Sequence, residues 1–338
     1  MAVIEAIESP PSPVQRLFRL LSNEKKDIGY IYLYAIVTGI ISLSLPLGIQ
    51  AVFNLVSGGL VFSSVYVLIG LVIAGVIIAG LLLIGQMVLV EILQQRIFAK
   101  AAFEFAYRLP RIQPESFGGY YPPELMNRFF DVMTIQKGLP KLLIDLTAAA
   151  MQILFGIILL SFYHPVFLAF GLFTLLAVTG IVLISGPAGL RTSLRESKDK
   201  YKVVAYLEDI ARDLPGYRYR TANGSADQLE LIDHMDALVT NYLKNRQQHF
   251  GVLKRIFYNG LAFKTLITAG LLILGTTLVV GREMTLGQFV ASELVIVLIT
   301  SSVDKLLSGI DTVFDLLTAV EKIGSVTDLP LETETDHA

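Results

Sequence analysis

The sequence predicts an all-α integral membrane protein in which six transmembrane helices continue into long cytoplasmic helical extensions. Only 17% of the 338 residues are charged, against about 25% in an average soluble domain. Two blocks, residues 28–90 and 146–190, contain no Asp, Glu, Lys or Arg. A helix needs about 20 apolar residues to cross a bilayer, so each block is long enough for two spans.

The first block predicts spans 1 and 2. Span 1 covers Ile28–Val56 and contains Pro46, which a membrane helix tolerates when neighbouring helices satisfy the freed backbone groups. Span 2 covers Val61–Val90 after a short turn. No Gly or Pro occurs between Gly85 and Pro110, so this helix is expected to continue about 28 Å beyond the membrane.

The second block predicts spans 3 and 4, separated by a very short turn at His164-Pro165. A strongly helical charged segment follows and is expected to break at Pro215-Gly216. Span 5 is predicted at Ile256–Val280, and span 6 begins at Gly287. Span 6 continues as an amphipathic helix that must project from the membrane.

The distribution of basic residues predicts the orientation. Placing both termini and both long loops on one side puts 25 of the 27 Lys and Arg residues there, which marks that side as cytoplasmic and the membrane as the inner cell membrane. The expected organisation is a cytoplasmic arm with an interfacial helix (1–27), a six-span domain (28–325) with cytoplasmic excursions at about 91–145 and 186–255, and an acidic, disordered tail (326–338).

The N-terminal arm is expected to form a short amphipathic helix. Val14, Leu17, Leu20 and Leu21 share one helical face, and basic residues such as Arg16 lie elsewhere. Two interpretations remain open, a helix lying in the membrane interface and a solvated helix packed on other cytoplasmic elements.

Few residues support chemistry within the chain. Cysteine is absent, and the four histidines form no metal-binding motif. No G-x-x-x-x-G-K-[ST] sequence occurs, so no phosphate loop is available to bind ATP. The sequence predicts that the chain is not an enzyme and that it binds no metal and no cofactor.

Four stretches, in the expected order and on the expected topology, resemble the transmembrane domain of an ABC exporter. They are FEFAYRLPRIQPESFGGYYPPELMNRFFDVMTIQKGL, VVAYLEDIARDLPGYRYR, GREMTLGQFVASELVIVLITSSVDKLL and TAVEKIGSVTDLP. The third contains the family's Thr-x-Gly-Gln pattern at Thr285, Gly287 and Gln288. The first departs from the family, because Pro122-Pro123 replaces the usual Gly before the Glu-Leu pair, and Asp131 is displaced.

The resemblance implies that the tips of the two excursions dock on ATPase domains. The implied docking residues are Pro123, Glu124, Leu125, Asn127, Arg128, Phe129, Tyr206, Glu208, Asp209, Arg212 and Gly216. The alternative for the first tip is a solvated turn stabilised by packing of Tyr120, Tyr121, Phe129 and Phe130.

Polar residues inside the predicted spans are candidates for a translocation pathway. They are Gln50, Asn54, Gln152, Lys264 and Glu293. Intramembrane charges usually face protein or a water-filled cavity. The alternatives for Lys264 and Glu293 are a structural pair or contact with the membrane interface.

The resemblance therefore implies the membrane part of an ATP-driven exporter that works by alternating access. The implied partners are a second copy or a related chain, an ABC ATPase domain or subunit that carries ATP and Mg, membrane lipids and a periplasmic adaptor, with no nucleic acid. The alternative is a membrane scaffold or regulatory partner that keeps the exporter fold without an ATPase.

Overall fold

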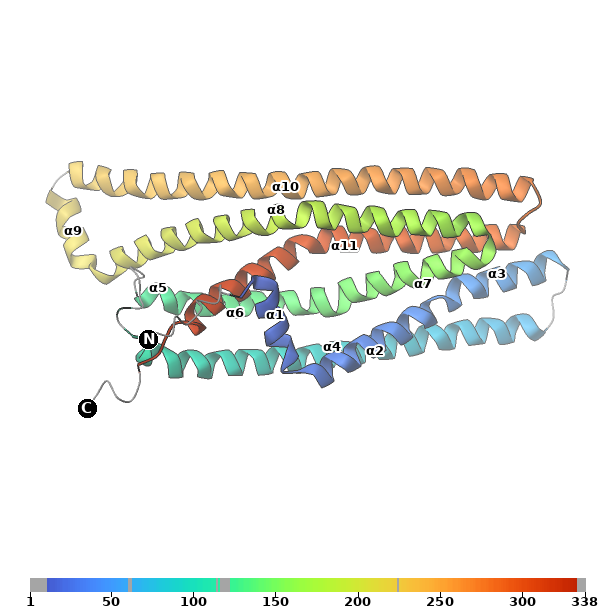
Figure 1. Cartoon of the computed structure of the whole chain (residues 1–338), viewed down its shortest axis with the longest axis horizontal. Coiled ribbons are helices and arrows are strands. Elements are labelled where there is room, and N and C mark those ends of the chain that lie inside the picture. Colours follow the sequence, from blue (N-terminus) through green and yellow to red (C-terminus); the bar gives the residue numbers. More distant parts are fainter. Residues whose placement is uncertain (1–10, 60–62, 114, 116–121, 224, 333–338) are drawn as a thin grey trace, which may run out of the picture.

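The computed structural model describes residues 11–59, 63–113, 115, 122–223 and 225–332. Six helical segments of this part of the chain are long and apolar enough to cross a membrane. They are α2 (Lys25–Ser42) with α3 (Ser44–Ser57), α4 (Ser63–Arg108), α7 (Thr147–Tyr163) with the helical turns before it, α8 (Pro165–Arg212), α10 (Ser225–Val280) and α11 (Leu286–Thr327). They lie side by side along one long axis (Figure 1).

The bundle has two unlike ends (Figure 1). At one end, the turn end, α7 stops at Tyr163 and α8 begins at Pro165, which confirms the predicted short turn. His164 is extended, and its Nδ1 accepts a hydrogen bond from the Val166 N–H at 3.3 Å. At the other end, the excursion end, α4 runs unbroken to Arg108 as predicted.

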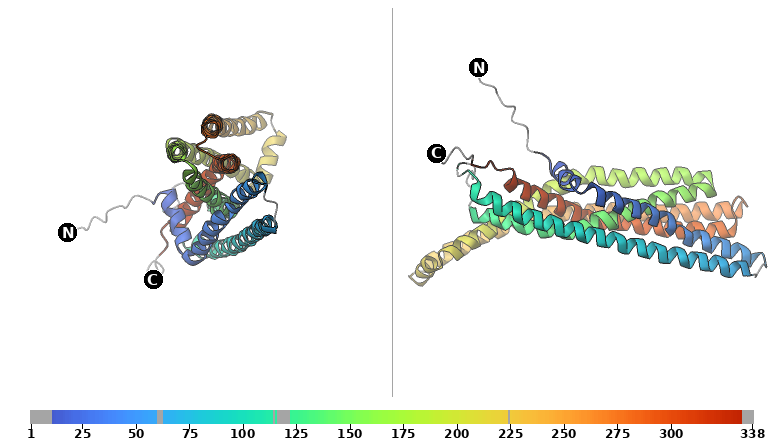
Figure 2. Two further views of the ribbon diagram at one scale, coloured as in Figure 1. Left: turned by 90° about the vertical axis from the view of Figure 1, so that its right-hand side faces the viewer. Right: turned by 90° about the horizontal axis from the view of Figure 1, so that it is seen from below.

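The excursion end carries the shorter elements. They are α1 (Pro13–Ser22), the 3-10 turn η1 (Leu109–Arg111), α5 (Pro122–Asn127), the 3-10 turn η3 (Arg128–Phe130), α6 (Asp131–Pro140), the π-helical turn η4 (Lys141–Leu146) and α9 (Leu214–Asn223). Figure 2 shows that α9 extends beyond the other elements at this end.

Helix α11 contributes to the apolar packing on both sides of the bundle. One cluster joins it to α7, α8 and α10 through residues such as Ile299 and Phe314. A second cluster joins it to α1, α2, α4 and α6 through residues such as Leu316 and Val320. The predicted apolar face of α11 is confirmed, since Leu307, Ile310, Phe314 and Leu317 are all buried.

Span 1 differs from the predicted continuous helix. Helix α2 ends at Ser42 and α3 begins at Ser44, with Leu43 between them. Pro46 lies in the first turn of α3, where the backbone N–H that proline lacks would have no partner within the helix. The span is therefore two helical pieces.

The break in the second excursion also lies earlier than predicted. Helix α8 ends at Arg212, and Pro215-Gly216 falls in the first turn of α9. Asp213 leaves the helical conformation and accepts a hydrogen bond from the Gly216 N–H through Oδ1 at 3.1 Å. Asp213 thus satisfies a backbone donor of the first turn of α9 and sets the corner.

The tail predicted as disordered is partly ordered. Helix α11 continues to Thr327, and Leu331 forms an antiparallel bridge with Ile112. The Gln113 N–H donates to the Pro330 carbonyl at 3.1 Å. The prediction fails here because the backbone partner is more than 200 residues away. Residues 333–338 lie outside the described residues.

Helix α1 packs on the bundle. Ser12 caps its N-terminus, and Leu17 is buried against the second apolar cluster. Arg16, predicted away from the buried face, is only 9% exposed. It forms ion pairs with Glu321 at 3.0 Å and Asp328 at 2.5 Å, so paired charge compensates for its burial.

Candidate functional site

The tip of the first excursion is anchored by an apolar cluster. Leu125 of α5 is fully buried and packs with Phe105, Ile112 and Val326. The Phe129 ring meets the Phe105 ring edge-on at 5.5 Å between centroids. Because the cluster draws on α4, α5 and α11, the short helix α5 is held against two long helices.

Polar bonds tie the same tip to the second excursion and to α11. The Asn127 Nδ2 donates to Glu208 Oε1 of α8. The Arg128 Nη1 donates to Ser325 Oγ of α11 at 2.6 Å, and Arg128 is 2% exposed. Three elements from distant parts of the sequence therefore meet at the tip.

The next turn adds a buried acid. Tyr201 of α8 donates its hydroxyl to Asp131 Oδ2 at 2.5 Å. Asp131 lies in the first excursion, outside the membrane-spanning segments. Burial raises the pKa of its carboxyl group, while the Tyr201 hydrogen bond and the positive charges of Lys200, Lys322 and Arg128 oppose that rise.

The structure corrects the expected role of two docking residues. Leu125 and Arg128 point into the chain, so their side chains position the tip and present no contact surface to a partner. The exposed apolar side chains here are Met126 and Phe130, at 54% and 61% exposure. Met126 lies in α5 and Phe130 ends η3, so the two are exposed on neighbouring elements.

The other predicted residues of the first tip are either half-buried or outside the described residues. Phe129 and Asn127 are half-buried. The side chains of Pro123 and Glu124, and both Tyr120 and Tyr121, lie outside the described residues, so these four predictions stay predictions.

The predicted docking residues of the second tip fall into two groups, one packed within the chain and one on the surface. Tyr206 faces α10, where its hydroxyl donates to the Leu231 carbonyl at 3.3 Å and its ring lies 4.5 Å from that of His234. Asp209 and Arg212 form an ion pair of 2.7 Å on the surface. Sequence analysis missed two exposed apolar residues nearby, Leu214 and Tyr219.

The polar residues of the spans find separate neighbours. The Tyr163 hydroxyl donates to Gln50 Oε1 at 2.7 Å. Ser302 donates to Gln152 Oε1 at 2.8 Å. These bonds join α3 to α7 and α7 to α11.

Lys264 and Glu293 are not a pair. The Lys264 Nζ lies 2.5 Å from Asp304 Oδ2, a residue that sequence analysis did not select for the pathway. The Glu293 Oε1 is buried and has no hydrogen-bond partner among the described residues. In that same part of the chain, no hydrogen bond joins any two of the five predicted pathway residues.

Asn54 marks a close approach of α3 and α11. An ideal Cβ placed on Gly287 would lie 2.1 Å from Asn54 Oδ1. The neighbouring Thr285 caps α11, because its hydroxyl accepts from the Gln288 N–H at 3.2 Å and Gln288 Oε1 accepts from the Thr285 N–H at 2.9 Å. The Thr-x-Gly-Gln pattern thus starts α11 and lets α3 approach it.

Comparison with known proteins adds one match. The model of the family described as the ABC transporter transmembrane region matches residues 28–212. No curated protein matches the chain.

Proposed function

The chain belongs to the family of ABC transporter transmembrane regions, and we propose that it forms the translocation pathway of an ATP-driven exporter by alternating access. Two copies, or this chain and a related one, would enclose the pathway. ATPase domains supplied elsewhere would carry ATP and Mg. The excursion end would face the cytoplasm, with both chain ends on that side of the inner membrane.

The main support for this proposal is the attachment of the first excursion's tip to α4, α8 and α11. A docking surface that transmits force needs a rigid connection to the spans. Closure of the ATPase domains can move the spans only if the surface and the spans move as one packed body. Leu125 fixes the tip to α4 and α11, and the bonds of Asn127 and Arg128 fix it to α8 and α11. A push on α5 would therefore reach three spans.

The exposed side chains beside these anchors suit a docking surface. Met126 and Phe130 are apolar and accessible on the first tip, and Leu214 and Tyr219 on the second. Docking would remove these apolar groups from water, which supplies the driving force for association. The surface ion pair of Asp209 with Arg212 would lie at the polar rim.

The test is ATP hydrolysis by the complex purified from native membranes through a tag on this chain. Phe130→Asp places a charge on the proposed docking surface, and we expect at least a tenfold loss of transport-coupled hydrolysis. Phe103→Asp is the matched control, since Phe103 is 79% exposed, belongs to α4 and is not a member of the apolar cluster that anchors the tip; its activity should stay within about twofold of the parent.

The absence of cysteine permits a direct contact assay. Met126→Cys introduces a single thiol in the chain, and a thiol-reactive photocrosslinker there should capture a P-loop ATPase. Crosslinking to no ATPase, together with unchanged function in Phe130→Asp, would refute the exporter and favour an ATPase-free scaffold.

A further inference from the structure

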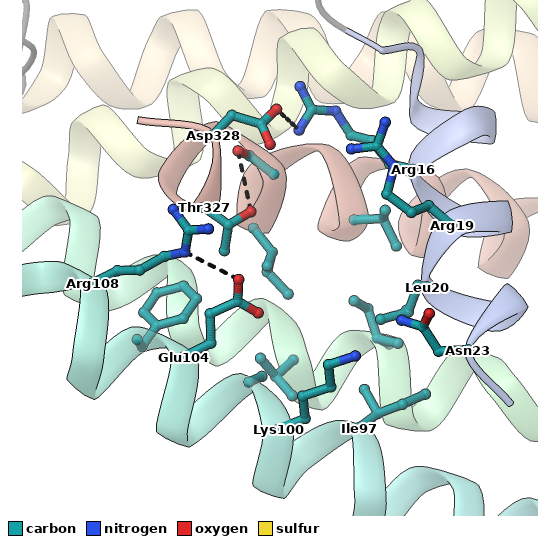
Figure 3. Close-up of a pocket in the computed structure, with 17 residues that line it drawn as sticks. Arg16, Arg19, Leu20, Asn23, Ile97, Lys100, Glu104, Arg108, Thr327 and Asp328 are labelled. Atoms are coloured by element: carbon teal, nitrogen blue, oxygen red, sulfur yellow. Dashed lines mark hydrogen bonds and ion pairs between the residues drawn. The ribbon is translucent and has the colours of Figure 1, made fainter. Parts of the chain in front are cut away.

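A pocket at the excursion end borders the first docking tip, with which it shares Phe105. It opens between α1, α4, α6 and the last turns of α11, with a volume of about 320 Å³ (Figure 3). That volume falls at the lower end of the range for small-molecule sites.

The interior of the pocket is apolar. Its buried apolar side chains come from α4, α6 and α11 and are Ile97, Phe105, Val132, Ile135 and Val320. Leu20 of α1 and Ile323 of α11 add half-buried apolar surface. A purely hydrophilic ion would leave this lining without a favourable contact, so the interior favours a ligand with an apolar part.

The rim of the pocket is basic. Four cationic residues line it, Arg16, Arg19, Lys100 and Arg108, against two carboxylates, Glu104 and Asp328. The carboxylates are already engaged within the chain: Arg108 pairs with Glu104 at 3.1 Å and Arg16 with Asp328 at 2.5 Å.

Two of the four cations remain available. Within the described residues, the side chains of Arg19 and Lys100 have no ion-pair partner, and both are exposed. Figure 3 shows them on opposite sides of the open space, Arg19 on α1 and Lys100 on α4. Two such cations around the opening of an apolar interior suit a phosphate group that carries hydrocarbon.

Helix α1 connects this pocket to the start of α2, and the pocket lining on α4 begins about 10 Å beyond the predicted end of span 2 at Val90. The face of α1 away from the bundle exposes Phe18 at 68% and Val14 at 43%. Span α2 begins at Lys25, three residues after α1 ends. An amphipathic helix joined so closely to a span lies in the interface, at the depth of the lipid headgroups.

We propose that the pocket binds an acidic phospholipid from the leaflet on the excursion side. Arg19 and Lys100 hold the phosphate of the headgroup, and the glycerol and first methylene groups lie against Leu20 and Ile97. Arg16, fixed by Glu321 and Asp328, keeps α1 in place as one wall. The bound lipid would join α1 to α4 and so stabilise the end of the bundle.

The experiment counts lipid bound to the full chain. The protein is purified in detergent, delipidated and titrated with phosphatidylglycerol or phosphatidylcholine, with native mass spectrometry as the readout. We expect one saturable phosphatidylglycerol site that phosphatidylcholine does not fill. Arg19→Ala with Lys100→Ala should weaken it about thirtyfold, because each basic side chain near the headgroup contributes to the attraction.

Two further variants test the location. Lys25→Ala with Lys26→Ala removes the same charge beside the same interface, outside the pocket, and should leave the site intact. Ala101→Phe fills the pocket without changing charge and should abolish binding. Equal loss in both double variants, or unchanged affinity in a folded Ala101→Phe protein, would overturn the proposal.

Glycerol 3-phosphate tests whether the pocket binds a lipid or a soluble phosphate compound. It carries glycerol and phosphate without acyl chains, and its protection against thermal unfolding is compared with that of phosphatidylglycerol. Protection by the lipid alone supports the proposal, and equal protection by glycerol 3-phosphate would overturn it. None of these readouts depends on transport or on an ATPase.

Discussion

Removal of the Arg128 side chain should loosen the tip of the first excursion selectively. Arg128 is 2% exposed, donates to Ser325 at 2.6 Å and places a positive charge near the buried Asp131. Arg128→Ala removes a positive charge near the Asp131 carboxylate and removes the hydrogen bond to Ser325 of α11. The loss of a buried hydrogen bond from a charged group costs up to about 3 kcal/mol.

Hydrogen exchange measures this loss of free energy as more frequent local opening of the tip. About 3 kcal/mol corresponds to exchange roughly 150-fold faster in residues 125–131, because each 1.4 kcal/mol changes an opening equilibrium about tenfold. Peptides from the membrane half of α4 should keep their protection, since the aromatic contacts of the tip with α4 lie at Phe98 and Phe105, in its excursion half.

Arg212→Ala is the matched control on the second tip. Its ion pair with Asp209 joins side chains that are 59% and 49% exposed, and such surface pairs contribute about 0 to 1 kcal/mol. Exchange near Arg212 should therefore rise by no more than about fivefold. Similar increases in both variants, or no increase in Arg128→Ala, would show that Arg128 does not anchor the tip.

Two other predictions concern single contacts. Gly287→Ala should lower the thermal unfolding temperature in detergent, because the added Cβ would lie 2.1 Å from Asn54 Oδ1; Asn54→Ala should restore most of the loss, and additive losses would refute the close approach. Asp131→Asn should become more stable relative to the parent as pH rises above 3.8, the ordinary carboxyl pKa. Burial raises the pKa of Asp131 in the folded state, so ionisation of this carboxyl destabilises the folded parent, and the variant has no such group. A difference in unfolding free energy between variant and parent that stays constant from pH 4 to pH 7 would contradict this prediction.

The sequence predicted the features that depend on local composition. Charge-free blocks located the spans, and the lack of Gly and Pro after Gly85 predicted the extension of α4. The short turn at His164 also follows from a local residue type, the proline that starts the next helix, and α11 begins at Leu286, one residue before the predicted Gly287.

Features that depend on distant partners were missed. Burial of Arg16 requires Glu321 and Asp328, and burial of Arg128 brings it to Ser325. No helical periodicity within α1 or η3 indicates these contacts, because all three partners lie on α11 or just beyond it. Helical periodicity therefore assigned Arg16 to the surface, and the family resemblance assigned Arg128 to a docking surface.

The end of α11 connects the docking tip with the proposed lipid pocket. Ser325 accepts the bond from Arg128 at the tip, while Glu321 and Asp328 hold Arg16 in the wall of the pocket. These three residues lie within about two helical turns. A displacement of α11 along its axis would thus change both contacts together. The lipid affinity of the pocket should therefore respond to the state of the docking tip, and, because coupling between sites is reciprocal, bound lipid should change the docking affinity by the same factor.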